Sequence, residues 1–120
     1  MKTINIDNIK SQMRKGMLEF CILLVLRRGP AYSSELIKCL KDARLIVVEG
    51  TLYPLLTRLK NEGLLAYTWQ ESTSGPPRKY YSLTEEGSAA LELLAEAWQD
   101  MSATVGHLFT NQDNETSNQE

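Results

Sequence analysis

The sequence predicts a mainly α-helical fold with a small β-hairpin, arranged as a winged helix-turn-helix that is followed by a long C-terminal helix. Three observations predict this fold. Within residues 49–63, Leu52, Leu55, Leu56 and Leu59 form one apolar stripe of helical period. Two alternating segments flank the turn-forming residues 72–77, and the last apolar residues recur at three- and four-residue steps. A chain of 120 residues has room for one modest core, so these elements are expected to form a single small domain.

Composition excludes little, but charge is distributed unevenly. The hydrophobic content of 42% and the charged content of 23% are ordinary for a globular protein and argue only against disorder. Residues 1–83 hold all 13 Lys and Arg against 7 acids, a net charge of +6, whereas residues 84–120 hold no Lys or Arg and 8 acids. This asymmetry indicates a polyanionic partner for the basic part. An acidic, solvated helix that simply lacks cations is the alternative.

The chain shows no signal for a membrane or for secretion. Its longest unbroken apolar run, residues 20–26, is much shorter than the roughly 20 residues of a membrane-spanning helix. Residues 1–10 lack the apolar core and cleavage site of a signal peptide, so we expect a cytoplasmic protein. Cys21 and Cys39 lie in apolar helical patterns without CxxC spacing, and we expect both to be buried thiols.

The first two helices are expected over residues 9–28 and from residue 31 onward. Gly29 and Pro30 end the first helix, whose second half is apolar on nearly every side and must be covered from several directions. Tyr32 or Ser33 stands near the cap of the second helix, where hydroxyl and N–H groups make a natural phosphate site. Simple capping is the alternative for Ser33. Residues 41–48 are then a connector, formed as a turn or a very short strand.

The third helix, residues 49–63, is expected to have one buried face and one free face. Its leucine stripe must face the core, while Thr51, Tyr53, Pro54 and Thr57 lie outside that stripe and leave the other face available for a partner. Taken alone, an ordinary amphipathic surface helix explains the same pattern. Gly63 is expected to end this helix as its C-cap.

The remaining elements are a hairpin and a long helix. Residues 64–71 and 78–83 alternate as two strands, with basic side chains beside the hairpin tip. Thr84 is expected to cap the last helix, whose first turn is acidic. The expected domains are a winged helix-turn-helix over residues 1–83, with its N-terminal helix also in a dimer interface, a C-terminal dimerisation helix over residues 84–109, and a disordered tail over residues 110–120.

Two linked motifs resemble the PadR family of bacterial transcriptional regulators. These are EGTLYPLLTRLKNEGLL and SGPPRKYYSLTEEG, and MLEFCILLVL in the first helix is similar as well. The resemblance covers roughly residues 13–109 and includes the spacing between the motifs. It implies a homodimeric repressor of the short branch of the family, with a single C-terminal helix for dimerisation. Many relatives have Tyr-Gly where this chain has Tyr32 and Ser33.

The order of elements predicts how double-stranded DNA is bound. The third helix enters the major groove, and the hairpin places cations on neighbouring phosphates or the minor groove. Base contacts are expected from the free face of the third helix, and contacts to phosphates from the start of the second helix, the third helix and the wing. The first set is Thr51, Tyr53, Pro54 and Thr57, and the second is Tyr32, Ser33, Ser34, Arg58, Lys60, Arg78 and Lys79. Each single cation is otherwise explained as a solvated surface charge. Two-fold symmetry predicts a pseudo-palindromic operator.

The apolar seam of the last helix predicts a homodimer. It exceeds what one small body needs, and the first helix supplies a second apolar surface. The expected interface residues are Met13, Met17, Phe20, Leu91, Leu94, Trp98, Met101, Val105 and Leu108. Trp98 is most simply a packing residue. Because some short PadR proteins bind flat aromatic compounds between paired tryptophans, a second hypothesis is that a planar hydrophobic effector binds between Trp98 and its mate.

No pattern in the sequence indicates catalysis, a cofactor or a metal site. His107 is the only histidine, and no Ser/His/Asp, Cys/His or metal-ligand spacing exists, so we do not expect an enzyme. A winged helix that serves only protein–protein interaction, without direct DNA binding, is the alternative to a DNA-binding regulator.

Overall fold

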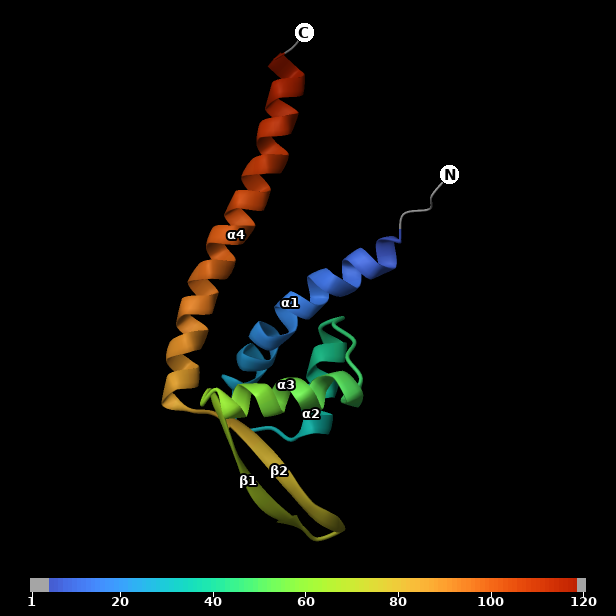
Figure 1. Cartoon of the computed structure of the whole chain (residues 1–120), viewed down its shortest axis with the longest axis vertical. Coiled ribbons are helices and arrows are strands. Elements are labelled where there is room, and N and C mark those ends of the chain that lie inside the picture. Colours follow the sequence, from blue (N-terminus) through green and yellow to red (C-terminus); the bar gives the residue numbers. More distant parts are fainter. Residues whose placement is uncertain (1–4, 119–120) are drawn as a thin grey trace.

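The computed structural model describes residues 5–118, with side chains described for residues 5–111. The elements in order are α1 (Ile6–Leu26), α2 (Ser33–Asp42), α3 (Glu49–Asn61), β1 (Leu65–Ser72), β2 (Gly75–Leu83) and α4 (Glu85–Asn118). Helices α1 to α3 form a body, the hairpin extends beyond α3, and α4 stands away from the body at its far end (Figure 1). The mainly helical fold with a two-stranded wing and a long C-terminal helix is therefore confirmed.

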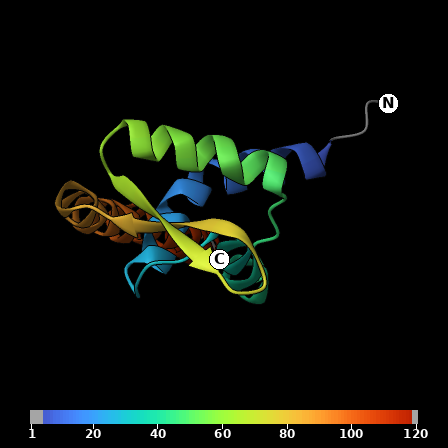
Figure 2. The same ribbon diagram turned by 90° about the horizontal axis from the view of Figure 1, so that it is seen from below.

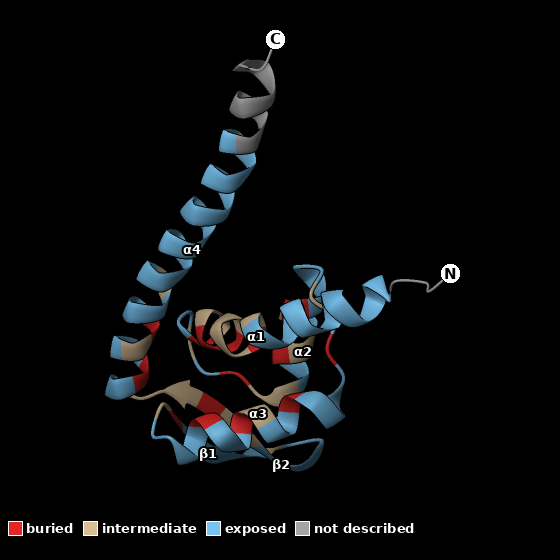
Figure 3. Ribbon diagram, turned by 45° about the horizontal axis from the view of Figure 1, so that its top comes forward, coloured by how far each residue is buried: buried red, intermediate tan, exposed pale blue. Residues whose placement is uncertain are grey.

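The core lies between the second half of α1, helix α2 and one face of α3 (Figure 3). The base of the hairpin and the first turns of α4 also contribute residues to it. Of the predicted leucine stripe, Leu52, Leu56 and Leu59 are fully buried and Leu55 is half-buried. Complete burial of one such leucine contributes about 1.5–3 kcal/mol, so these three side chains hold α3 on the body. The cysteines are free and only partly buried, so the expectation of buried thiols was too strong. Burial nevertheless raises the pKa of the Cys21 thiol.

Local hydrogen bonds explain where the first two helices begin. The Asn5 side chain accepts from the Asn8 N–H at 3.0 Å, and α1 therefore begins at Ile6, earlier than expected. Helix α1 ends before Gly29, whose φ is 145°. Tyr32 is the N-cap residue of α2, and its carbonyl accepts from the Glu35 N–H at 3.0 Å. Residues 43–48 form a turn followed by irregular backbone. Of the two alternatives for the connector, the structure has the turn and not the very short strand.

The hairpin is longer than the sequence pattern predicted. Its strands pair antiparallel from Leu65 with Leu83 to Ser72 with Gly75, so the expected loop over residues 72–77 is wrong in extent. Pro76 and Pro77 fit into β2 because they lie between its paired residues Gly75 and Arg78, where the register shifts and the regular ladder is interrupted. Ala31 pairs with the free edge of β2, which the sequence did not indicate. Its N–H donates to the Tyr81 carbonyl at 3.0 Å and its carbonyl accepts from the Tyr81 N–H at 2.8 Å.

A tight junction joins α3, the hairpin and α4. The Thr84 hydroxyl donates to the Gly63 carbonyl at 2.6 Å and accepts from the Gly87 N–H at 3.0 Å, which confirms Thr84 as the helix cap. Gly63 has a φ of 82° and follows α3 in the left-handed conformation expected of a C-cap. A Cβ at Gly87 would overlap the Leu64 carbonyl oxygen. Glycine is therefore required where α4 crosses the start of the wing.

Helix α4 differs from the prediction in length and in its first turns. It continues past Phe109 to Asn118, so the expected disordered tail is wrong for residues 110–118. Residues 119 and 120 lie outside the described residues. Neither Gly nor Pro interrupts residues 110–118, and extending an existing helix costs much less than starting one. Leu91 is 3% exposed in the single chain and belongs to its core. Its assignment to a dimer interface is corrected, because the first turns of α4 pack on α1.

Among the helices within residues 5–118, none combines the length and the hydropathy that crossing a membrane requires.

Candidate nucleic-acid interface

Helix α3 presents a free face next to the wing. The predicted base-contacting residues Thr51, Tyr53, Pro54 and Thr57 are all exposed and lie outside the buried leucine stripe. Tyr53 and Thr57 are on the side of the wing, whereas Thr51 and Pro54 border a hollow beside α1. Seen from below, α3 and the hairpin lie next to one another on the same side of the molecule (Figure 2). The free face and the wing can therefore contact one extended partner together.

The start of α2 joins this surface through a side-chain hydrogen bond. Ser33 Oγ lies 2.9 Å from the Tyr53 hydroxyl, so the two hydroxyls orient each other across α2 and α3. Ser33 does not cap its own helix, because the backbone of Tyr32 occupies that position. Side chains of α2, α3 and the wing enclose a hollow of about 490 Å³. Its lining residues are Tyr32, Ser33, Ser34, Glu49, Tyr53, Thr57, Trp69, Pro77, Arg78, Lys79 and Tyr81.

Four residues that line this hollow were not predicted as site residues, namely Glu49, Trp69, Pro77 and Tyr81. Glu49 and Trp69 stand among the predicted hydroxyls and cations. The first turn of α3 and the alternation of β1 place these two residues in their elements, but only the packed structure shows that both line the same hollow.

The wing cations are held over aromatic rings. The Arg78 guanidinium lies 4.5 Å from the centre of the Tyr32 ring, and the Lys79 ammonium lies 4.4 Å from that of Tyr67. Lys60 reaches the Tyr67 ring from α3, at 5.6 Å. Such contacts are worth about 0.5–1 kcal/mol at exposed sites and restrict the long side chains before any partner arrives. Three of the predicted cations are thus gathered at one wing, and less side-chain entropy remains to be lost on binding.

Arg58 is positioned differently from the other cations. Its guanidinium contacts the Glu19 carboxylate of α1 at 2.9 Å and the Glu62 carboxylate at 3.3 Å. Both pairs are partly exposed, so each adds little stability. They nevertheless direct the Arg58 side chain toward α1, which makes it less available to a phosphate than Lys60, Arg78 or Lys79.

Tyr81 anchors the wing to the body. Its side chain is buried, its ring lies 5.9 Å from that of Tyr67, and its backbone pairs with Ala31. Burial and, to a smaller extent, the neighbouring Tyr53 and Tyr67 raise the pKa of the Tyr81 phenol. The wing is therefore fixed at its base to the segment that leads into α2.

Comparison with known proteins identifies this arrangement. The family described as "Transcriptional regulator PadR-like family" matches residues 22–93, which run from α1 through the wing into α4. The chain belongs to the PadR-like family of transcriptional regulators. It is similar to the solved structure of a PadR-like transcription factor from Bacteroides fragilis, with 63% identity over 84% of this chain and 98% of that one and a TM-score of 0.72.

Two further PadR-family structures show the same architecture. A regulator from Eggerthella lenta is 38% identical over 87% of this chain and 91% of its own, with a TM-score of 0.79. A PadR-like regulator from Bacillus cereus is 41% identical over 82% of this chain and 96% of its own, with a TM-score of 0.73. The predicted family and short form are thus confirmed. PadR-like proteins are regulators and not enzymes, and membership implies DNA binding.

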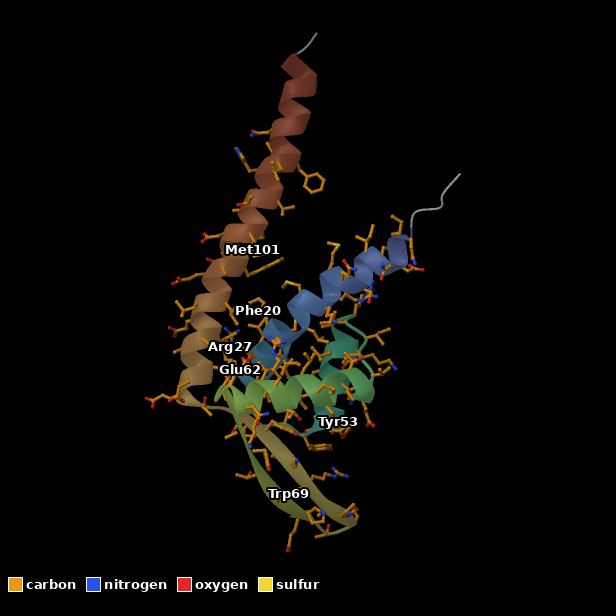
Figure 4. All side chains as sticks on the ribbon, in the orientation of Figure 1. Phe20, Arg27, Tyr53, Glu62, Trp69 and Met101 are labelled. Atoms are coloured by element: carbon orange, nitrogen blue, oxygen red, sulfur yellow. The ribbon has the colours of Figure 1, made fainter. Side chains whose placement is uncertain are left out.

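This PadR-like chain also carries a second, apolar surface. Met13 on α1 is exposed, Met17 and Phe20 are partly buried, and the predicted α4 residues after Leu91 are exposed. In Figure 4 Phe20 and Met101 both lie in the space between α1 and α4. Further exposed apolar side chains, which the prediction omitted, lie on the same two helices. These are Ile6, Ile9, Leu93 and Phe109.

Within the described part of the chain, no group of three or more His, Cys, Asp and Glu side chains is placed to hold a metal ion.

Proposed function

We propose that the chain is a homodimeric repressor that binds a pseudo-palindromic operator in double-stranded DNA. The observation that carries this proposal is the juxtaposition of the free face of α3 with the cations of the wing around one hollow. A helix of this kind fits the major groove, and a hairpin beside it reaches the adjacent phosphates or minor groove. The net charge of +6 on residues 1–83 supports a polyanionic partner.

The residues divide into two roles. Thr51, Tyr53, Pro54 and Thr57 read base edges, through hydroxyl hydrogen bonds and apolar contact with thymine methyl groups. The remaining predicted residues contact phosphates and set affinity more than sequence preference. These are Tyr32, Ser33, Ser34, Arg58, Lys60, Arg78 and Lys79, among which Arg58 contributes least because its two carboxylate partners hold it.

Unpartnered apolar faces support the dimer. Trp98, Met101 and Val105 are about half exposed, at three- and four-residue spacing on α4. Phe20 of α1 and Met101 of α4 both lie in the space between the two helices (Figure 4), so two α4 helices packed with two α1 helices would bury both surfaces. Paired symmetrically, the two recognition helices address half-sites about one helical turn of DNA, or a multiple, apart.

Trp98 offers a site for an effector that releases the repressor. Its ring is 45% exposed in the single chain, and a two-fold axis near it would bring two indoles together. A planar aromatic compound stacks well between such rings. Ligand titrations followed by tryptophan fluorescence test this part, with Trp98→Ala as the variant. Quenching that persists undiminished in Trp98→Ala excludes the site.

A gel-shift assay on the chain's own promoter region tests DNA binding. Affinity should fall roughly 10³- to 10⁵-fold between about 50 and 200 mM salt if the dimer neutralises about six to ten phosphates. Arg78→Gln and Lys79→Gln should each lower the salt slope by about one or more. Lys41→Gln, near the other end of α2, is the matched control and should change neither quantity. A dimer that shifts no DNA at low salt supports the protein-interaction alternative and overturns the proposal.

A further inference from the structure

Trp69 is a large apolar side chain left in solvent on the wing. It is 61% exposed, in the middle of β1 (Figure 4). Exposed tryptophans are uncommon away from binding surfaces, because the indole gains more from burial than almost any other side chain. Neither the core nor the proposed dimer surface on α1 and α4 uses this residue.

The packing around Trp69 orders its ring. Tyr67, two residues earlier on the same face of β1, meets it edge to face with ring centres 6.3 Å apart. Lys79 is its direct cross-strand partner, and the Lys79 ammonium lies 5.4 Å from the indole ring as well as 4.4 Å from that of Tyr67. A flat apolar ring and a cation are therefore held side by side at a fixed spacing.

The position of this pair relates it to the recognition helix. Trp69 and Lys79 line the same hollow as Ser33, Ser34 and Thr57. They belong to the face of the hairpin that meets α3, since Lys60 of α3 contacts the Tyr67 ring on that face. A partner that contacts the free face of α3 and continues along the wing therefore also meets the Trp69 indole.

We propose that Trp69 is a DNA-contacting residue that packs on the sugar–phosphate backbone flanking the bases read by α3, and that it holds Lys79 in place for the neighbouring phosphate. Deoxyribose offers an apolar surface beside a negative charge, which matches an indole beside an ammonium. One acidic residue, Glu49, also lines the hollow and could repel a phosphate. It lies in the first turn of α3, where base edges rather than phosphates are expected. This inference rests on the proposed DNA-binding function.

A contact to the backbone carries no sequence information, and this sets the expected results. Trp69→Ala should weaken binding about tenfold, by the same factor for the operator and for a short duplex of random sequence at low ionic strength. The slope of log affinity against log salt should stay nearly unchanged, because no charge is removed and the nearer Tyr67 ring still holds the Lys79 ammonium. Trp69→Phe, which keeps an aromatic ring on Tyr67, should lose clearly less. Thr68→Ala, on the opposite face of β1, is the matched control and should bind as the wild type does.

Intrinsic fluorescence gives an independent readout, since the chain has 2 tryptophans. Random duplex should protect the wild type from acrylamide quenching, whereas Trp69→Phe, which retains only Trp98, should show no protection. A wild type that binds neither duplex overturns the repressor proposal and this inference together. A wild type that binds while Trp69→Ala binds equally well overturns the inference alone. A Trp69→Ala protein that becomes monomeric in light scattering also overturns it, and assigns the indole to the dimer.

Discussion

Helices α3 and α4 carry the same kind of apolar stripe, yet the single chain buries one and leaves the other exposed. Leu56 on α3 is 0% exposed, whereas Met101 on α4 is 58% exposed. The stripe of α3 is covered by α1, α2 and β1, while α4 contacts the body only through its first turns. Periodicity thus shows which face of a helix requires burial, but not whether the same chain supplies the cover.

The largest expected difference between the two stripes is in folding stability. Leu56→Ala should lower the free energy of unfolding by about 2–5 kcal/mol, because it leaves a cavity among fully buried side chains. Urea unfolding followed by circular dichroism measures this loss. Thr57→Ala, the exposed neighbour, should change the stability by less than about 0.5 kcal/mol. Equal effects from both variants would contradict the burial of the α3 stripe.

The α4 stripe should respond through association instead. Met101→Ala combined with Val105→Ala should raise the dimer dissociation constant by about 10- to 100-fold, since both side chains are exposed in the single chain. Sedimentation over a dilution series measures this constant. Gln99→Ala lies away from the stripe and should leave it unchanged. If the double variant unfolds more readily at all protein concentrations but dimerises normally, the stripe packs within its own chain.

The junction between the two regions should tolerate no added side chain. Gly87→Ala should destabilise the fold by about 1–3 kcal/mol, because its Cβ meets the Leu64 carbonyl oxygen. Gly106→Ala, also within α4, has open space around the new Cβ and should stabilise the helix by about 0.5–1 kcal/mol. Thermal unfolding of both variants checks this contrast. A neutral Gly87→Ala would show that α4 can move away from the wing.

The smallest expected effect concerns alkaline pH and the anchoring of the wing. The pKa of Tyr81 is raised in the folded chain, so the unfolded phenol ionises first as the pH rises. Stability should therefore fall above pH of about 10, and Tyr81→Phe should remove part of that fall. Urea midpoints measured from about pH 8 to 11 test this. Parallel pH profiles for the two proteins would contradict a buried, neutral Tyr81.

Several features follow from local sequence. The leucine stripe of α3, the hairpin and the Thr84 cap were all predicted, because each depends on residues within a few positions of one another. The linked motifs around α3 and the wing also predicted the family that comparison confirmed. The predicted DNA contacts, the dimer and the effector site remain proposals.

Other features depend on contacts between residues far apart in the chain. The pairing of Ala31 with Tyr81, the burial of Leu91 and the pairing of Arg58 with Glu19 have no local signature. The same holds for Trp69 and Lys79, whose spacing depends on the register of the two strands.

Periodicity and capping are properties of neighbouring residues, so they identify the elements and the face of each that needs cover. Which face finds that cover in the same chain depends on packing in three dimensions. Packing buries the stripe of α3 and leaves that of α4 exposed, although the two patterns look alike in the sequence. The difference arises because burial depends on which surfaces come within contact distance, and that is decided by the whole chain at once.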